Sequence, residues 1–344
     1  MTQRPILAAT MGDPAGIGPE ICVRAAFAPE VRAASRMFVI GDARMLERAM
    51  SVCGLSARIN RVGGPEDLAD QPGVIDVLHQ DSADPAAVQM GKIQPLGGQA
   101  AYAAIRASID LAMAGRIAGV VTAPINKESL QAAKIPFIGH TEMFAEHTGA
   151  KEEMTMFTIS GLKIFFLTRH VSLRQACDLI TEPRVTKGID HCVKALRQLG
   201  YDNPHLAVAA LNPHGGEDGM FGREEIDGIK PAIAAARARG LHISGPVPAD
   251  SVFHLARIGR YDAVLSLYHD QGHIAAKMMD FEKTVSVTLG LPVLRTSVDH
   301  GTAFDIAGTG KASAVSMVEA ILVAADYVVK GVRLGDAPAA RAAE

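Results

Sequence analysis

The sequence has no tryptophan and only four cysteines, and its positive and negative charges nearly cancel. The cysteines show no CxxC pair or regular spacing, which argues against a zinc knuckle and a disulfide framework and fits a reducing cytoplasm. The formal net charge is -3 and the 34 lysines and arginines are scattered, so we expect no surface for nucleic acid. An anionic ligand must therefore be bound by a few local cations.

Long apolar runs are absent as well. The N-terminus, MTQRPILAATMGD, lacks the layout of a signal peptide. Glu319 and Asp326 interrupt the apolar stretch near the C-terminus before it could span a bilayer. We therefore expect a cytoplasmic protein without membrane association, and we expect the last residues, APAARAAE, to form a loose tail.

The sequence does contain a repeated alternation of short β-rich runs with longer segments of helical period. Strands are predicted at 6–9, 37–40, 75–78 and 117–121, and a helix is predicted over 99–114. This alternation is typical of a doubly wound α/β sheet. The runs MTMFTIS and LKIFFLT then flank Ser160 and Gly161 and predict an antiparallel hairpin. After the hairpin the alternation resumes, with strands predicted at 205–211, 263–267 and 285–289.

A chain of 344 residues with 48% hydrophobic residues is expected to form two α/β lobes with room for a cleft between them. We assign residues 1–128 and 296–344 to the first lobe and residues 129–295 to the second. No linker separates the two, so we expect the chain to cross between the lobes more than once.

Three of the twelve histidines follow predicted strands: His170 after LKIFFLTR, His214 in LNPHGGEDG and His269 in LSLYHDQGH. Ligands of open α/β sheets bind at the carboxyl ends of strands, so these three could converge on a divalent metal. The alternative is that each is an ordinary loop or capping histidine. A further alternative pairs His269 with His273 on a helix, as in zinc hydrolases, although HDQGH does not match HExxH and Gly272 disfavours a helix.

Two glycine-rich segments are candidates for ligand binding. MGDPAGIGPE follows the first predicted strand and precedes a helix that begins near Pro19 and Glu20. It lacks both GxGxxG and GxxxxGK[ST], so a purely structural turn is as well supported as a phosphate loop. DHGTAFDIAGTG, with Lys277 and Arg295 before it, gathers charges among glycines, which favours a binding surface over ordinary turn chemistry.

Taken in order, the blocks MGDPAGIGPE, VTAPINKESL, GHTEMFAEHTG, LNPHGGEDGMFGREE, LYHDQGH and LGLPVLRTSVDHGTA resemble the 4-hydroxythreonine-4-phosphate dehydrogenase family. DHGTAFDIAG also resembles the HGxAxDIAG segment of isocitrate and isopropylmalate dehydrogenases, which bind NAD without a Rossmann fingerprint. The resemblance implies a two-lobed α/β/α fold with mostly parallel sheets and an active-site cleft between the lobes. It also implies a cytoplasmic homodimer that oxidises and decarboxylates a small phosphorylated hydroxy acid with NAD and a divalent metal (Zn, Mg, Mn or Co).

The resemblance assigns roles to individual residues. It implies that His170, His214 and His269 are the metal ligands, with the site shared between subunits. The substrate-binding residues that it implies are His140, Thr141, Lys277, Ser286 and Arg295. The predicted catalytic residues are Asp250, which matches an acidic residue lining the same pocket, and Lys277, a candidate for proton transfer. The implied cofactor-binding residues, in the first lobe, are Asp299, His300, Gly301, Thr302, Ala303, Asp305 and Ile306.

One substrate position departs from the family pattern. Ser286 in VSVTLGLP stands where the enzymes of vitamin B6 biosynthesis usually carry Asn, and HDQGHIAAK differs from the HDQGLPVLK type. Both features resemble a second branch, the D-threonate or D-erythronate 4-phosphate dehydrogenases of sugar-acid catabolism. Terephthalate dihydrodiol dehydrogenases are more distant relatives. A metal-dependent hydrolase and a non-enzymatic two-lobed binding protein are the alternative classes, and neither would change nicotinamide absorbance.

Overall fold

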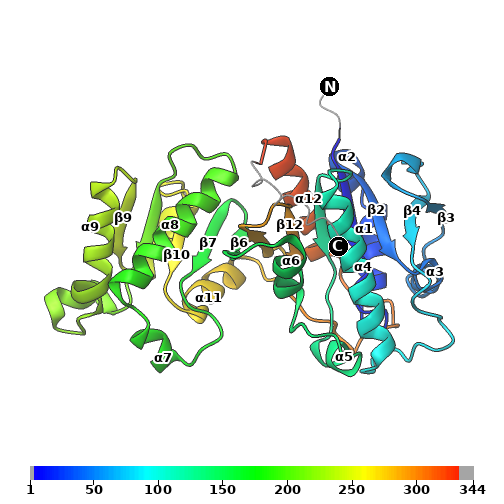
Figure 1. The fold of residues 1–344 in the computed structure, drawn as a ribbon, viewed down its shortest axis with the longest axis horizontal. Coiled ribbons are helices and arrows are strands. Elements are labelled where there is room, and N and C mark those ends of the chain that lie inside the picture. The colour runs from blue at the N-terminus through cyan, green and yellow to red at the C-terminus, as the bar shows by residue number, and fades with distance from the viewer. Residues whose placement is uncertain (1–3, 333–344) are drawn as a thin grey trace, which may run out of the picture. The chain divides into compact units, whose positions relative to one another are not determined.

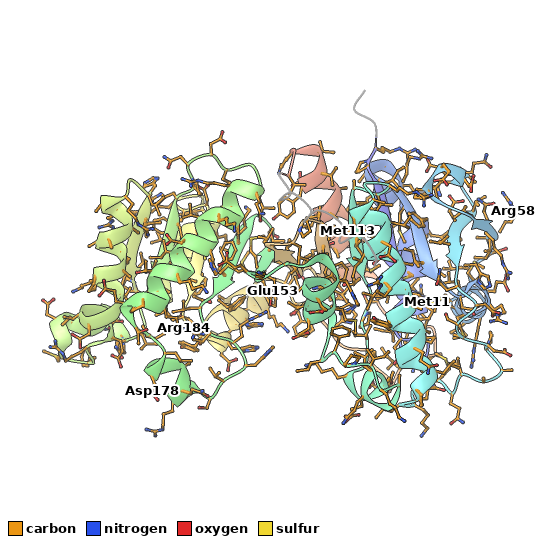
Figure 2. All side chains as sticks on the ribbon, viewed as in Figure 1. Met11, Arg58, Met113, Glu153, Asp178 and Arg184 are labelled. Atoms are coloured by element: carbon orange, nitrogen blue, oxygen red, sulfur yellow. The ribbon has the colours of Figure 1, made fainter. Side chains whose placement is uncertain are left out.

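The computed structural model describes residues 4–332, which form two compact α/β units. The first unit runs to Glu153, labelled in Figure 2, and resumes at Gly290; the second is Met154–Leu289. Figure 1 shows the elements of both units along the chain. The alternation of strands and helices that the sequence predicts is confirmed, whereas the predicted tail APAARAAE lies outside the described residues.

The sheet of the first unit is parallel throughout. Its strands, in spatial order, are β3 (Arg58–Val62), β4 (Val74–His79), β2 (Arg36–Gly41), β1 (Ile6–Thr10), β5 (Gly119–Thr122) and β12 (Arg295–Val298). The central strands β1 and β5 are buried almost throughout, as expected for a parallel sheet covered on both faces. Because the strands share one direction, the loops that follow β1, β5 and β12 emerge at the same edge.

Helices cover this sheet and complete its core. They are α1 (Gly18–Phe27), α2 (Pro29–Ala34), α3 (Ala43–Val52), α4 (Pro95–Met113), α5 (Lys127–Ala132), α6 (His140–Thr148) and α12 (Val315–Val329), with a 3-10 turn η1 (Pro65–Asp67). The long helix α4 buries Ile105 and Ile109 in one cluster with Ala8, Phe38 and Val120 of the strands. Helix α12 packs against β12 and β5.

The boundary of the first unit differs from the one predicted. Residues 129–153 were assigned to the second lobe, yet Leu130 of α5 and Met143 and Phe144 of α6 are fully buried in the core around α4. These side chains would lose that burial in any other arrangement, so α5 and α6 belong to the first unit. The divisions therefore fall after Glu153 and before Gly290 rather than at 128 and 296.

The sheet of the second unit is mixed. Its strands, in spatial order, are β11 (Val285–Leu289), β6 (Met154–Ile159), β7 (Leu162–Phe166), β10 (Ala263–Ser266), β8 (Leu206–Ala209) and β9 (Ile243–Val247). The pairs β11–β6 and β6–β7 are antiparallel, and β7, β10, β8 and β9 run parallel. The predicted hairpin is confirmed: Ser160 and Gly161 join β6 to β7 with φ of 46° and 87°, the left-handed pair that a two-residue hairpin turn favours.

The helices of the second unit are α7 (Leu173–Asp178), α8 (Glu182–Gln198), α9 (Lys230–Ala238), α10 (Ala249–Arg257) and α11 (His269–Met279), with the 3-10 segment η2 (Pro213–Gly219) and the π-helical turn η3 (Glu225–Ile229). Val252 of α10 and Ala276 of α11 share a core cluster with Phe157, Ile164 and Val264 of the strands. Among residues 4–332, no helix has both the length and the apolar character needed to cross a membrane.

Candidate functional site

Three loops meet at the carboxyl edge of the first sheet. They follow β1, β5 and β12, which are neighbours in the sheet. The amide of Asp13, after β1, donates to the carbonyl of Pro124, after β5 (3.1 Å), and the amide of Ile17 donates to the carbonyl of Thr302 (3.0 Å). The predicted cofactor block 299–306 therefore lies at the edge where open α/β sheets bind ligands.

A buried cation lies at the start of β12. Arg295 is only 5% exposed, its Nη2 donates to the Thr122 hydroxyl (3.0 Å), and its guanidinium carbon is 5.4 Å from the centroid of the Phe144 ring. Burial lowers the pKa of Arg295 to about 10, although the charge of Glu142 opposes this shift. A desolvated guanidinium is suited to binding a phosphate or carboxylate in a bidentate way.

His140 lies beside this cation at the start of α6. Its Nε2 is buried and has no hydrogen-bond partner within the described part of the chain, although part of the residue reaches the surface. Burial, followed by the charge of Arg295, lowers the pKa of His140 well below its usual value. The structure thus brings together His140 and Arg295, with Thr141 adjacent in the chain, and leaves a neutral imidazole nitrogen for a ligand oxygen.

The neutrality of His140 predicts a pH-dependent stability. The folded chain resists protonating this imidazole, whereas the unfolded chain takes up a proton below about pH 6.5. The contribution of His140 to the free energy of unfolding is therefore fully present above that pH. It decreases as the pH falls, by up to about 1.4 kcal/mol per pH unit. Urea midpoints at pH 7.5 and 5.5 should differ less for His140→Gln than for the parent. Equal differences in the two proteins would contradict the prediction.

The three predicted metal-binding histidines follow three adjacent parallel strands of the second sheet. His170 follows β7, His269 follows β10 and His214 follows β8, and β10 is the central strand of the three. Side chains connect the loops: the Thr168 hydroxyl donates to the carbonyl of Leu267 (2.8 Å), and Nε2 of Gln271 donates to the carbonyl of Ala210 (2.8 Å).

The structure brings only two of these histidines together. The ring centroids of His170 and His269 are 6.1 Å apart. Within residues 4–332, no group of three His, Cys, Asp or Glu side chains is placed to hold a metal ion, so His214 does not join the pair in one chain.

Nδ1 of His269 hydrogen-bonds to Oδ1 of Asp270 (2.6 Å). When Nδ1 of a histidine donates its proton to a carboxylate, Nε2 keeps its lone pair. This tautomer suits a metal ligand. The role of Asp270 was not predicted, although its place directly after His269 was a signal.

His214 sits in a strained turn. Residues 214–218 all have left-handed φ values, and three of them, His214, Glu217 and Asp218, are not glycine. Such conformations cost free energy and persist only where the surroundings impose them. Here the buried carboxylate of Glu225 accepts hydrogen bonds from the amides of Leu211 and Asn212 (both 2.8 Å). Sequence reasoning missed Glu225, which carries no signal without the fold.

The alternative pair His269 and His273 does share helix α11, and the expectation that Gly272 disfavours a helix there is wrong. Glycine is needed because a Cβ at this position would lie 2.5 Å from the Phe166 ring. The two imidazoles are stacked, with centroids 3.6 Å apart and planes 9° apart. Ring nitrogens bind metals in the ring plane, and nearly parallel planes do not converge on one ion. The geometry therefore does not favour the arrangement of zinc hydrolases.

The remaining predicted residues lie on separate elements of the second unit. Asp250, in the first turn of α10, lines a cavity of about 500 Å³ together with Tyr268 and Asp270, which flank His269 in the chain. Nζ of Lys277, in the last turn of α11, is 5.0 Å from the centroid of the Phe281 ring. Ser286 is partly exposed on β11, opposite Phe157 of β6.

Comparison with known proteins relates this arrangement to a family. The family model of the pyridoxal phosphate biosynthetic protein PdxA matches residues 33–324. A protein of Symbiobacterium thermophilum, provisionally named a D-threonate 4-phosphate dehydrogenase, is 56% identical over 327 residues, covering 95% of this chain and 98% of its own.

Solved structures give the same result. A 4-hydroxythreonine-4-phosphate dehydrogenase of Klebsiella pneumoniae is 40% identical, with a TM-score of 0.88 over 94% of this chain and 98% of that one. A terephthalate 1,2-cis-dihydrodiol dehydrogenase of Burkholderia xenovorans is 28% identical, with a TM-score of 0.63 over 94% and 98% of the two chains. The family match spans most of the chain, and the chain therefore belongs to the PdxA family of pyridoxal phosphate biosynthetic proteins and their dehydrogenase relatives.

Proposed function

We propose that this protein oxidises and decarboxylates a small 4-phosphorylated hydroxy acid, with NAD as hydride acceptor and a divalent metal bound by histidines. The observation that carries the proposal is the desolvated guanidinium of Arg295 beside the neutral imidazole of His140, whose buried Nε2 has no hydrogen-bond partner among residues 4–332. Relatives named for 4-phosphorylated substrates support the same substrate class.

Arg295 and His140 are the proposed binding groups for substrate oxygens. The fold has already removed much of the water around the buried guanidinium. Binding of a phosphate or carboxylate therefore requires little further desolvation of Arg295. Two parallel N–H donors also orient the anion. The neutral His140 offers a hydrogen bond to a substrate oxygen without adding a second positive charge that Arg295 would repel.

His170, His214 and His269 are the proposed metal ligands. The hydrogen bond from His269 to Asp270 fits this role, because it leaves Nε2 as the coordinating nitrogen. Since only two of the three approach one another within one chain, we place the site across a homodimer whose second copy supplies the missing histidine. Bound there, a divalent metal would supply Lewis acidity towards the substrate's hydroxyl and carbonyl oxygens.

Proton transfer is assigned to Asp250 and Lys277. Loss of a hydride from the substrate's carbinol carbon to NAD, and of the hydroxyl proton to a base, gives a ketone β to the carboxylate. Asp250, which lines the cavity next to His269, is the proposed base. Loss of carbon dioxide then leaves an enolate, and Lys277 is the proposed donor of the proton that its carbon takes up.

A nicotinamide assay tests the proposal. Purified protein with NAD, a divalent metal and a panel of 4-phosphorylated hydroxy acids should reduce NAD, and a chelator should stop the reaction. The initial rate with NAD is expected to exceed the rate with NADP. Asp305 lies in the cofactor block, and the block contains no arginine cluster that could bind the 2′-phosphate of NADP. Absence of NAD reduction across the panel would refute the proposal, and hydrolysis of the same compounds would favour a hydrolase.

Ser286 predicts the choice between 2-hydroxy and 2-amino substrates. A serine hydroxyl donates and accepts through a single oxygen, whereas the amide of Asn presents an NH2 donor and a carbonyl acceptor at two separate atoms. Loss of one good partner costs about 1 to 3 kcal/mol, so preference should shift about tenfold or more. We expect D-threonate or D-erythronate 4-phosphate to be used at least as well as 4-phospho-hydroxy-L-threonine. Ser286→Asn should shift kcat/KM towards the amino compound. A parent selective for the amino compound, and unchanged by the substitution, would show that this position does not determine specificity.

A further inference from the structure

The segment MGDPAGIGPE has no role in the proposed reaction, yet it is built against the block expected to hold the cofactor. Residues 301–314, which include most of the block 299–306 and the turn after it, form turns and irregular structure rather than a helix or strand. Ala303, Gly308 and Gly310 have left-handed φ values of 42°, 78° and 72°. A loop without a hydrogen-bond ladder of its own takes its shape from the segments that it contacts.

Glu20 contacts this loop through both of its carboxylate oxygens. The residue lies in the first turn of α1 and is only 2% exposed. Its Oε1 accepts a hydrogen bond from the amide of Gly308 (2.6 Å), and its Oε2 accepts one from the amide of Gly310 (3.0 Å). One turn further along α1, Nη2 of Arg24 donates to the carbonyl of Gly310 (2.7 Å). The turn at 308–310 is therefore held by two charged side chains of one helix.

The earlier part of the block is held by backbone contacts with the same region. A Cβ at Gly16 would lie 2.8 Å from Cβ of Thr302, so glycine permits this close approach. The amide of Ile17 donates to the carbonyl of Thr302 (3.0 Å). Residues 16–24 thus determine the position of the block at Thr302 and again at Gly308 and Gly310.

We propose that Glu20 is a positioning residue for the nicotinamide cofactor, acting through the 308–310 turn on the cofactor-binding residues before it. The inference rests on the proposed function, because it takes residues 299–306 as the NAD-binding residues. Two charge-assisted hydrogen bonds stabilise the bound form of the loop before the cofactor arrives, which lowers the entropy lost on binding. MGDPAGIGPE then supports the cofactor site without contacting phosphate itself.

Glu20→Gln tests this role with almost no change in side-chain size. An amide oxygen can accept from one glycine N–H, but the amide nitrogen is a donor and opposes the other. We expect the Kd for NAD, measured by titration calorimetry, to rise about tenfold or more, since two charge-assisted bonds are affected. Amide exchange in peptides covering 299–310 should become faster even without NAD. The KM for substrate and the metal content should change little, and Glu20→Asp should restore part of the NAD affinity.

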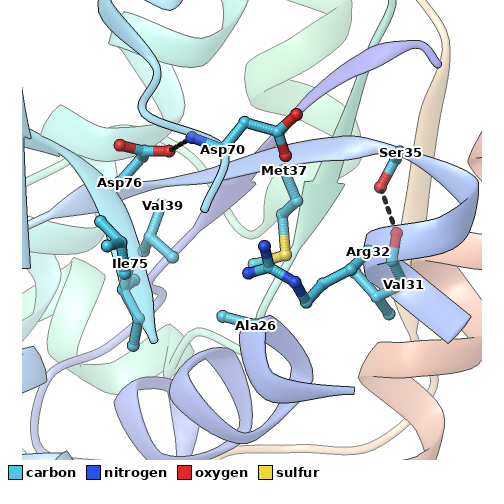
Figure 3. A pocket seen from close by; sticks show the side chains of 10 residues that line it. Ala26, Val31, Arg32, Ser35, Met37, Val39, Asp70, Ile75 and Asp76 are labelled. Atoms are coloured by element: carbon cyan, nitrogen blue, oxygen red, sulfur yellow. Dashed lines mark hydrogen bonds between the residues drawn. The ribbon is translucent and has the colours of Figure 1, made fainter. Parts of the chain in front are cut away.

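Asp76→Asn is the matched control. Asp76 of β4 is also a buried carboxylate of the first unit, 4% exposed, and accepts from the amides of Ala69 and Asp70 (both 3.0 Å); Figure 3 shows the bond to Asp70. This variant should lose thermal stability while its Kd for NAD stays at the parental value.

Three results would overturn the inference. One is an equal loss of NAD affinity in Asp76→Asn, which would make the effect one of general destabilisation. Another is parental NAD affinity in Glu20→Gln, which would refute the role of Glu20 and leave the proposed function standing. A parent protein that binds no NAD would refute the proposed function and this inference together.

Discussion

His269→Ala is expected to remove bound metal and to lower turnover by about a thousandfold or more. The Lewis acidity of a divalent metal supplies several kcal/mol of transition-state stabilisation, and each 1.36 kcal/mol corresponds to tenfold in rate. The fold should survive, because His269 is partly exposed and lies at the first position of α11 rather than in a core cluster. Metal content by elemental analysis, turnover and the thermal midpoint should be measured together. His170→Ala and His214→Ala are expected to behave in the same way.

His273→Ala is the control that separates the metal proposal from the helix-pair alternative. His273 is stacked on His269 at 3.6 Å and its Nδ1 bonds to the carbonyl of His269 (2.8 Å), so the substitution disturbs the same helix turn. We expect this variant to retain its metal. If His273→Ala lost metal as completely as His269→Ala, while His170→Ala kept it, the ligand set would be the pair on α11. Retention of metal and activity in all three single variants of the proposed ligands would refute a histidine metal site.

Arg295→Met is expected to raise the KM for a phosphorylated substrate about a hundredfold or more and to lower thermal stability only modestly. Each hydrogen bond to a charged group contributes about 1.5 to 3 kcal/mol, and a bidentate anion would lose two. The fall in stability should be modest, because the substitution removes a desolvated charge but leaves the buried Thr122 hydroxyl without its hydrogen bonds from Nε and Nη2 of Arg295. Steady-state kinetics and a thermal scan of the same preparations provide both values.

Arg116→Met is a suitable comparison for this variant. Arg116 pairs with Glu66 at 2.7 Å, but both side chains are exposed, and exposed pairs contribute little. Its substitution should leave the KM and the thermal midpoint near the parental values. A large fall in the midpoint of Arg295→Met, with an unchanged KM, would show that Arg295 is retained for packing on Phe144 rather than for an anion.

The type and order of the elements were predictable because burial leaves a periodic trace in the sequence. The runs at β1, β2, β4 and β5 are apolar almost throughout, as strands covered on both faces must be, and the hairpin followed from two β-rich runs on either side of Ser160 and Gly161. The strand β3 was missed because RINRV is polar and only partly buried at the edge of its sheet. The unit boundary was misplaced because nothing local in α5 or α6 indicates which core buries Leu130 and Phe144.

The sequence by itself determined which side chains stand at the ends of strands, since a residue after an apolar run is recognisable without a fold. That rule placed His170, His214 and His269 after β7, β8 and β10, whereas β12, the strand directly before the block from Asp299, was not predicted. Only the tertiary structure decided which of these approach one another, because strand order is set by long-range pairing that local sequence does not encode. It brought His170 to His269 but not His214, buried Arg295 beside His140, and set Glu20 against glycines that are 288 and 290 residues away in the chain.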